Sequence, residues 1–190
     1  PDDATIRLAV IEAPTRRLEA GLRYSTDVQM AANFSYRDVD VDREGLQMLV
    51  TGELDRKIQS GSLRFTQPAT AAGWLPTWVV GAKRTDIEGL ITHTAAAGTR
   101  WHTLEETRER AISGTFYLDD QYPADAASQR SHAAYVEVEQ YWREVDDLVA
   151  PTRGWVASAQ LGGGIPGIST RSFGRAIGRF AAWVPLDRAN

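Results

Sequence analysis

Apolar and polar residues alternate along most of this chain, and the alternation returns in segment after segment with loops between. From Arg17 to Ser25 the even positions are apolar or aromatic, while the odd positions are charged or small. The next segment repeats the pattern, with Met30, Ala32, Phe34 and Tyr36 on one face. A period of two is the spacing of side chains on a β-strand, so the sequence predicts antiparallel strands and an all-β fold.

Further segments continue this pattern with varying clarity. Residues 103–111 contain good helix formers, but the alternation that follows through Ile112, Gly114, Phe116 and Leu118 favours a strand with a charged beginning. Residues 119–130 are expected to form a solvent loop, 146–154 a turn and 162–167 a loop. About ten strands are therefore expected after an opening strand at 5–14. The later strands are placed at 46–54, 59–66, 74–83, 87–101, 103–118, 131–142, 155–161 and 173–184.

Composition excludes two classes of protein. In 190 residues with a mean hydropathy of -0.34, no run approaches the roughly eighteen apolar residues that a membrane-spanning helix needs. The lack of a long apolar run does not exclude a transmembrane β-barrel, because only alternate residues of each of its strands contact lipid. The net charge of -4 argues against a nucleic-acid-binding protein, which normally carries a basic surface.

The cysteine count and the N-terminus bear on location. The absence of cysteine excludes disulfides and thiolate metal sites, and it is compatible with a periplasmic or outer-membrane protein as well as with many others. Pro1, Asp2 and Asp3 do not resemble the start of a signal peptide. For an exported protein, we expect the sequence to be a mature or excised segment.

Aromatic and charged residues bear on the choice between a membrane barrel and a soluble β-sandwich, since both alternate. Aromatic residues near strand ends are typical of the interfacial girdles of a barrel, although core packing would also explain them. Charges in mid-strand, opposite the apolar face, suit a wet lumen, although a solvated sheet face would tolerate them equally. The aromatic residues are Tyr24, Tyr36, Trp74, Trp101, Tyr141, Trp142, Trp155 and Trp183. The charged residues are Glu19, Arg23, Arg37, Glu53, Glu137 and Glu139.

Three motifs resemble one family. The run Gly21-Leu-Arg-Tyr-Ser-Thr-Asp27 resembles the first barrel strand and hairpin of the BamA/TamA superfamily of outer-membrane assembly factors, with TamA the closer match. Residues 6–14 resemble the closing strand of the last POTRA domain, a periplasmic module joined to that barrel. A pair of aspartates followed by Pro-x-x-Gly resembles the family's periplasmic turn. The motif residues are Gly21, Tyr24, Ser25, Thr26, Asp27, Asp146, Asp147, Pro151, Arg153 and Gly154.

The resemblance implies a domain plan. Residues 1–14 would end the last POTRA domain, and 15–190 would form the N-terminal part of a sixteen-stranded antiparallel transmembrane barrel. Gln29 departs from the family, which usually has glycine there, and the family's inward loop and closing strand would come after Asn190. The resemblance therefore implies a fragment of a longer protein with two unpaired edges, which would be costly in lipid.

The resemblance also implies a function in the bacterial outer membrane. A factor of this kind helps to insert or secrete client proteins through a lateral seam, where a client strand pairs with the first strand by β-augmentation, with no enzyme chemistry and no cofactor. The seam residues would be Leu18, Ala20, Leu22 and Tyr24. Expected partners are outer-membrane lipid, client outer-membrane proteins or autotransporters and a TamB-like periplasmic protein, but no nucleic acid. The alternatives are a passive channel or secretion pore and a soluble β-sandwich binding domain.

Residues that could carry other chemistry are few. His93, His102 and His132 are scattered, and no nucleophile motif accompanies them. Asp38, Asp40 and Asp42 alternate and could hold calcium, but the following residues lack a calcium-loop pattern, so a solvated hairpin is the better interpretation. Gly162-Gly163-Gly164 lacks the Gly-Lys-Ser/Thr of a phosphate-binding loop and is expected to be a loop.

Overall fold

The computed structural model describes residues 14–26 and 29–185, and these residues contain ten strands and no helix. No helix that could cross a membrane occurs among them. The opening strand expected at 5–14 and the hairpin residues Asp27 and Val28 lie almost entirely outside the described residues. The strands are β1 (Arg16–Ser25), β2 (Gln29–Asp38), β3 (Gln47–Leu54), β4 (Ile58–Thr66), β5 (Trp74–Ile87), β6 (Leu90–Thr103), β7 (Arg108–Pro123), β8 (Gln129–Val145), β9 (Gly154–Gly164) and β10 (Gly174–Trp183).

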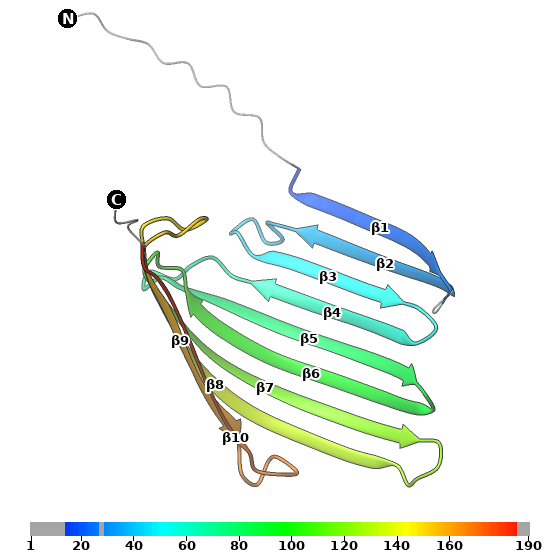
Figure 1. Cartoon of the computed structure of the whole chain (residues 1–190). Coiled ribbons are helices and arrows are strands. Elements are labelled where there is room, and N and C mark those ends of the chain that lie inside the picture. Colours follow the sequence, from blue (N-terminus) through cyan, green and yellow to red (C-terminus); the bar gives the residue numbers. More distant parts are fainter. Residues whose placement is uncertain (1–13, 27–28, 186–190) are drawn as a thin grey trace, which may run out of the picture.

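Each strand pairs antiparallel with the next, which gives one sheet in the order β1 to β10 (Figure 1). The sheet is curved, and β1 and β10 form its two edges. A meander of this kind needs only turns between neighbouring strands, which suits the short connections of the sequence. The prediction of an all-β fold with about ten antiparallel strands is confirmed.

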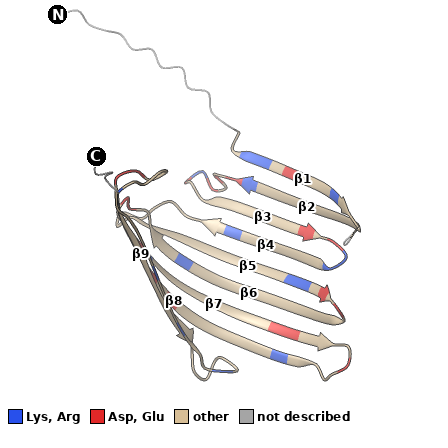
Figure 2. Ribbon diagram, viewed as in Figure 1, with Lys and Arg blue, Asp and Glu red and all other residues tan. Residues whose placement is uncertain are grey.

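The register keeps one apolar face and one polar face across the whole sheet. Leu18 pairs with Tyr36, and Val138 pairs with both Ile112 and Leu161, so apolar side chains continue from strand to strand. The predicted mid-strand charges all fall on the opposite, polar face, and Figure 2 shows charged positions within strands as well as in turns. Exposed members of the apolar face include Leu18, Leu22, Tyr24, Met30, Phe34, Leu54, Trp78, Val80, Trp101, Ile112, Phe116, Leu118, Val136, Val138, Leu161 and Phe180.

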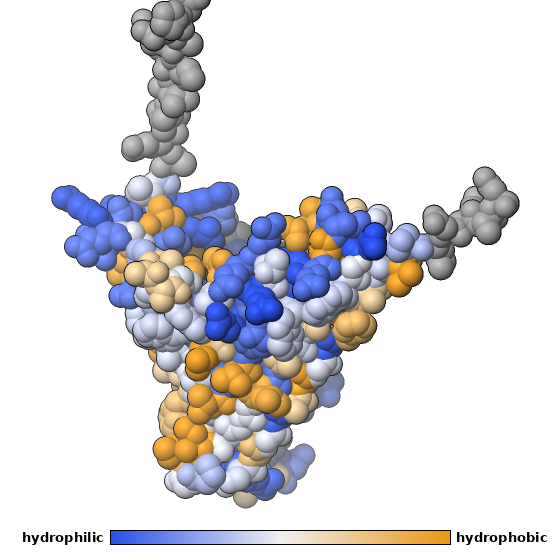
Figure 3. Space-filling model, turned by 90° about the vertical axis from the view of Figure 1, so that its left-hand side faces the viewer, coloured by the Kyte–Doolittle hydropathy of each residue, from blue (hydrophilic) through white to orange (hydrophobic). Residues whose placement is uncertain are grey.

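The sheet is a single layer without a hydrophobic core among the described residues. Apart from Pro76, the only buried hydrophobic residues there are Ala31 and Ala111, which are 7% and 5% exposed. A soluble sandwich buries the inner faces of two sheets, so this architecture does not fit that alternative. Seen from the left of Figure 1, hydrophobic residues gather in the lower part of the molecule and hydrophilic residues in the upper part (Figure 3).

The solvent loop predicted at 119–130 is confined to 124–128, and the prediction was wrong for the residues on either side. β7 continues to Pro123 and β8 begins at Gln129, so Asp119 and Asp120 lie within a strand. Their carboxylates have partners on neighbouring strands: Thr94 donates to Asp119 at 3.0 Å, and the Arg130 Nε donates to Asp120 at 2.6 Å. Acidic residues that usually mark loops are stable in these strands because each has a cross-strand donor.

Other predicted boundaries also need correction. Gly162-Gly163-Gly164 belongs to β9 and not to a loop, and an added Cβ at Gly163 would lie 2.9 Å from the Phe173 carbonyl oxygen. Ile87 ends β5 instead of starting the next strand, because Glu88 and Gly89 take positive φ angles of 52° and 83° and form a two-residue hairpin. The charged segment 104–107 is a connection before β7. Tyr141 and Trp183 lie on the polar face and cannot join a girdle on the apolar one.

Candidate functional site

The first strand presents strongly exposed side chains on the apolar face. Leu18, Leu22 and Tyr24 are 71%, 80% and 74% exposed. Strand β1 pairs with β2 over its whole length, from Arg16 opposite Asp38 to Ser25 opposite Gln29, and no described strand lies on its other side. The predicted seam residues therefore lie together on an edge strand.

The register also fixes which backbone groups of β1 point away from β2. The Val39 N–H donates to the Thr15 carbonyl at 2.9 Å, so these two residues form a hydrogen-bonded pair in the ladder. Hydrogen-bonded and non-hydrogen-bonded pairs alternate in an antiparallel ladder. The odd residues of β1 therefore bond to β2, whereas the N–H and C=O groups of Leu18, Ala20, Leu22 and Tyr24 point to the free edge.

Side-chain contacts hold the first half of β1 to β2. An ion pair joins Arg16 to Asp38 at 2.8 Å where the strand begins, and the Ser35 hydroxyl donates to Glu19 at 3.4 Å. Gly21 leaves space for Asn33, because an added Cβ would overlap the Asn33 amide. Attachment of β1 depends mainly on its backbone ladder with β2.

Gln29, the first residue of β2, takes a backbone conformation that glycine favours. Gln29 has a φ of 61°, in the left-handed region that glycine adopts without strain. A glycine at this position, which is usual in the BamA/TamA superfamily, would therefore suit the same backbone. Thr26 is in the turn, and Asp27 lies outside the described residues.

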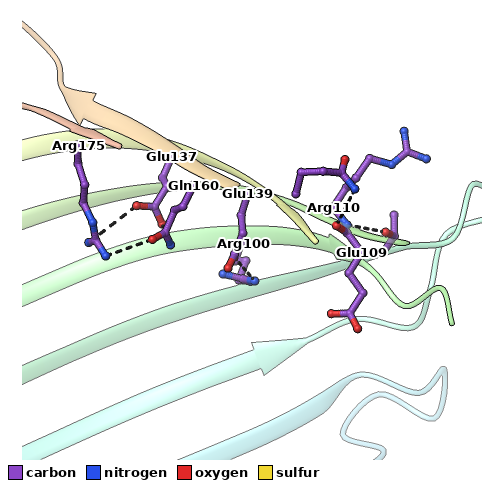
Figure 4. Close-up of polar contacts among 9 residues, drawn as sticks. Arg100, Glu109, Arg110, Glu137, Glu139, Gln160 and Arg175 are labelled. Carbon is purple, nitrogen blue, oxygen red and sulfur yellow. Dashed lines mark hydrogen bonds and ion pairs between the residues drawn. The ribbon is translucent and has the colours of Figure 1, made fainter. Parts of the chain in front are cut away.

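The polar face carries a cluster of charged and amide side chains on β6, β8, β9 and β10 (Figure 4). Arg100 pairs with Glu139 at 2.8 Å across β7. Gln160 donates to Glu137 at 2.9 Å, and Arg175 reaches both, at 3.2 Å to Gln160 and 3.9 Å to Glu137. Sequence reasoning identified the two glutamates but missed their partners, although the period-two pattern places Arg100, Gln160 and Arg175 on the same face.

Asp146 and Asp147 organise the turn between β8 and β9. The Asp146 carboxylate accepts from the Thr152 hydroxyl and from the N–H groups of Arg153 at 2.9 Å and Thr152 at 3.0 Å. These bonds, the hydroxyl first, lower the pKa of Asp146 to about 2. The Ala150 and Val149 N–H groups likewise lower the pKa of Asp147.

The other residues of this motif complete the same turn. The Asp146 N–H donates to the Arg153 carbonyl at 3.0 Å, and Pro151 lies between the two ends of the turn. Gly154 begins β9 with a φ of 119°, and a side chain there would overlap the Glu144 carbonyl. The structure thus brings Asp146, Asp147 and Gly154 together as turn-forming groups, away from the free edge of β1.

The remaining candidate residues are not brought together. His93 and His102 lie on opposite faces of β6, and His132 lies on β8 beside Thr170. Asp40 accepts the Gly45 N–H, and Asp42 accepts the Glu44 and Leu46 N–H groups, so both shape the connection between β2 and β3. Among the described residues, no group of three or more acidic or histidine side chains could hold a metal ion.

The geometry defines a class of fold, the wall of an up-and-down antiparallel barrel with one apolar and one polar face. No family model and no curated protein matches the sequence. The chain is similar in structure to BamA from Haemophilus ducreyi lacking POTRA domains 1-3, with a TM-score of 0.73 and 13% identity over 93% of this chain. It spans 38% of that BamA chain. The BamA-like barrel fold is confirmed; the predicted closeness to TamA and the POTRA segment remain predictions.

Proposed function

We propose that this chain is the N-terminal wall of an outer-membrane assembly factor, and that client strands add to the free edge of β1. The observation that carries the proposal is the outward direction of the backbone groups of Leu18, Ala20, Leu22 and Tyr24 on an edge strand of a BamA-like fold. Such an edge templates another strand by main-chain hydrogen bonds. The clients would be outer-membrane proteins or autotransporters.

The height of the apolar face supports a place in the outer membrane. On β7 this face carries no charge from Ile112 to Leu118, between Arg110 and Asp120. The ten steps from Arg110 to Asp120, at a rise of about 3.4 Å each, separate the two charged residues by about 34 Å along the strand, or by about 26 Å across a membrane at a tilt of about 40°. That height agrees with the apolar band of about 25 Å in outer-membrane barrels.

The mechanism follows from the two sets of backbone groups on β1: one set bonds to β2, and the other points to the free edge. A client strand would satisfy the outward N–H and C=O groups, which otherwise cost several kcal/mol each in hydrocarbon. Its apolar side chains would then continue the face formed by Leu18 and Leu22. Insertion needs no covalent step and no nucleotide in this scheme, because each new backbone bond replaces an unsatisfied group. A TamB-like periplasmic protein remains a proposed partner.

The alternation of backbone directions offers a matched pair of proline variants. Leu22→Pro removes an N–H that points to the free edge, and Gly21 before it tolerates the restriction that proline imposes on its neighbour. Arg23→Pro removes an N–H that bonds to β2. We expect Leu22→Pro to keep the β-sheet circular dichroism in liposomes and to slow insertion of an eight-stranded client barrel by about tenfold, since several edge bonds are disrupted.

The second variant and a distant proline serve as controls. Arg23→Pro should lose part of the β1–β2 ladder and unfold at lower urea concentration than Leu22→Pro. Ala176→Pro on β10 lies on the other edge, where the same alternation points its N–H away from β9, and it should leave client insertion unchanged. Normal insertion by a folded Leu22→Pro protein would exclude β1 as the docking edge.

A further inference from the structure

A groove of about 470 Å³ crosses the apolar face from β3 to β7. Gly61, Ala82 and Ala95 form its floor, and Leu54 and Leu118 stand at its sides. The register places Gly61, Ala82, Ala95 and Leu118 in one row across four strands. The floor is open because the residues along it are small: an added Cβ at Gly61 would meet only the Thr51 carbonyl, at 3.9 Å.

The next row along the same face is polar and closes one end of the groove. Gln59, Arg84, His93, Asp120 and Arg130 lie side by side on β4 to β8. Gln59, Arg84, His93 and Asp120 line the groove, whereas the small residues of its floor and Leu118 lie one row nearer the middle of the sheet, and Leu54 stands beside Gln59. The groove is thus an apolar channel that ends at the charged limit of the apolar band.

Each arginine of this row has a carboxylate partner, but the two pairs use their hydrogen-bond donors differently. Arg130 holds the Asp120 carboxylate through two nitrogens, at 2.6 and 3.0 Å. Arg84 contacts Asp86 through one nitrogen, at 2.9 Å, which leaves the other donors of its guanidinium group for another acceptor. His93 lies directly opposite Arg84 in the ladder, and its ring contacts that of Tyr122 at a tilt of 57°, with ring centroids 5.4 Å apart. Arg84 and His93 therefore present donors at the mouth of the groove.

We propose that the groove binds a phospholipid, with an acyl chain over Gly61, Ala82 and Ala95 and the phosphate against Arg84 and His93. The volume lies within the range of about 300 to 1,000 Å³ typical of small-molecule sites. The guanidinium fork matches phosphate geometry, and the apolar floor matches a hydrocarbon chain. This inference rests on the membrane location in the proposed function but not on client insertion at β1.

Native mass spectrometry of the protein in detergent tests the acyl-chain part. We expect the delipidated protein to bind one dioleoyl phosphatidylglycerol tightly, and Gly61→Leu to weaken that binding by about tenfold by filling the floor. Gly178→Leu is the matched control, because Gly178 lies on the apolar face of β10 with no atom near its added Cβ. Equal binding by the Gly61→Leu and Gly178→Leu proteins would overturn the proposal.

A second variant tests the phosphate part. Arg84→Gln should weaken phosphatidylglycerol about tenfold and leave dioleoylglycerol, which lacks the phosphate, unchanged. Arg64→Gln on the polar face of β4 is its control and should change neither. Equal losses for both lipids, or an equal loss in Arg64→Gln, would exclude a phosphate site. Circular dichroism and client insertion, measured on the same proteins, separate this result from unfolding and from failure of the proposed function at β1.

Discussion

The short-strand region, β1–β4, and the long-strand region, β5–β8, are built differently within one sheet. The short strands have 10, 10, 8 and 9 residues, and the long strands have 14, 14, 16 and 17. In the short-strand region the ion pair between strands joins Arg16 to Asp38 at one end. In the long-strand region, ion pairs cross between strands at both ends and in the middle, as at Arg130–Asp120, Arg100–Glu139 and Arg143–Glu109.

We infer from this difference that the short-strand region opens locally, whereas the long-strand region stabilises the sheet. A strand that is held mainly by its backbone ladder, with an ion pair only at its start, can open locally, which an edge that receives client strands requires. The longer strands make more backbone hydrogen bonds, and their cross-strand ion pairs resist local opening. We therefore expect perturbations of the long-strand region to affect the stability of the whole protein, and those of the short-strand region to act locally.

Glycine substitutions should give the largest difference in stability between the two regions. An added Cβ at Gly98 would lie 2.9 Å from the Gly114 carbonyl oxygen and 2.8 Å from the Thr115 hydroxyl, so neighbouring backbone blocks it. At Gly52 the obstacle is the Phe34 ring, which is 43% exposed and can rotate away. We expect Gly98→Val to lower the free energy of unfolding by about 2 to 3 kcal/mol and Gly52→Val by about 1 kcal/mol.

Urea titration in liposomes, followed by tryptophan fluorescence, measures the free energy of unfolding of both variants. Gly114→Val is the control within the long-strand region, since no atom lies within 4 Å of its added Cβ, and it should change stability by less than about 0.5 kcal/mol. Phe34→Ala should remove the cost of Gly52→Val in the double variant. Equal costs at Gly52 and Gly98 would contradict the difference in packing between the two regions.

Removal of a carboxylate from the polar face should lower the free energy of unfolding by a smaller amount, and this amount should also differ between the two regions. The Glu137 side chain is 12% exposed and accepts from Gln160, whereas Glu19 on β1 is 55% exposed and pairs with Arg17 of its own strand. We expect Glu137→Ala to cost about 1 kcal/mol and Glu19→Ala less than about 0.5 kcal/mol, measured by the same urea titration. A larger cost for Glu19→Ala would show that β1 is held by side chains after all.

Alternation in the sequence was sufficient to predict the strands and their two faces, because the period of two survives wherever one face is apolar. It failed at Asp119, Asp120 and Gly162, where residues typical of loops are held by partners on other strands. The seam residues could be placed on one strand, but the direction of their backbone groups depends on the register with β2. The groove could not be predicted, because it arises from small residues on separate strands that only the pairing brings into one row.

The smallest predicted effect is the pH response of the turn between β8 and β9. The pKa of Asp146 is lowered from 3.8 to about 2, so its carboxylate stabilises the folded turn at all pH values above about 4. This contribution is lost as the pH falls toward 2, because protonation removes the acceptor for the Thr152 and Arg153 N–H groups. In micelles, the amide resonances of these two residues should titrate with a midpoint near 2, and Asp146→Asn should abolish that titration. A midpoint near 3.8 would mean that the turn does not depend on Asp146, whereas loss of β1 signals over the same range would show that the two regions are coupled.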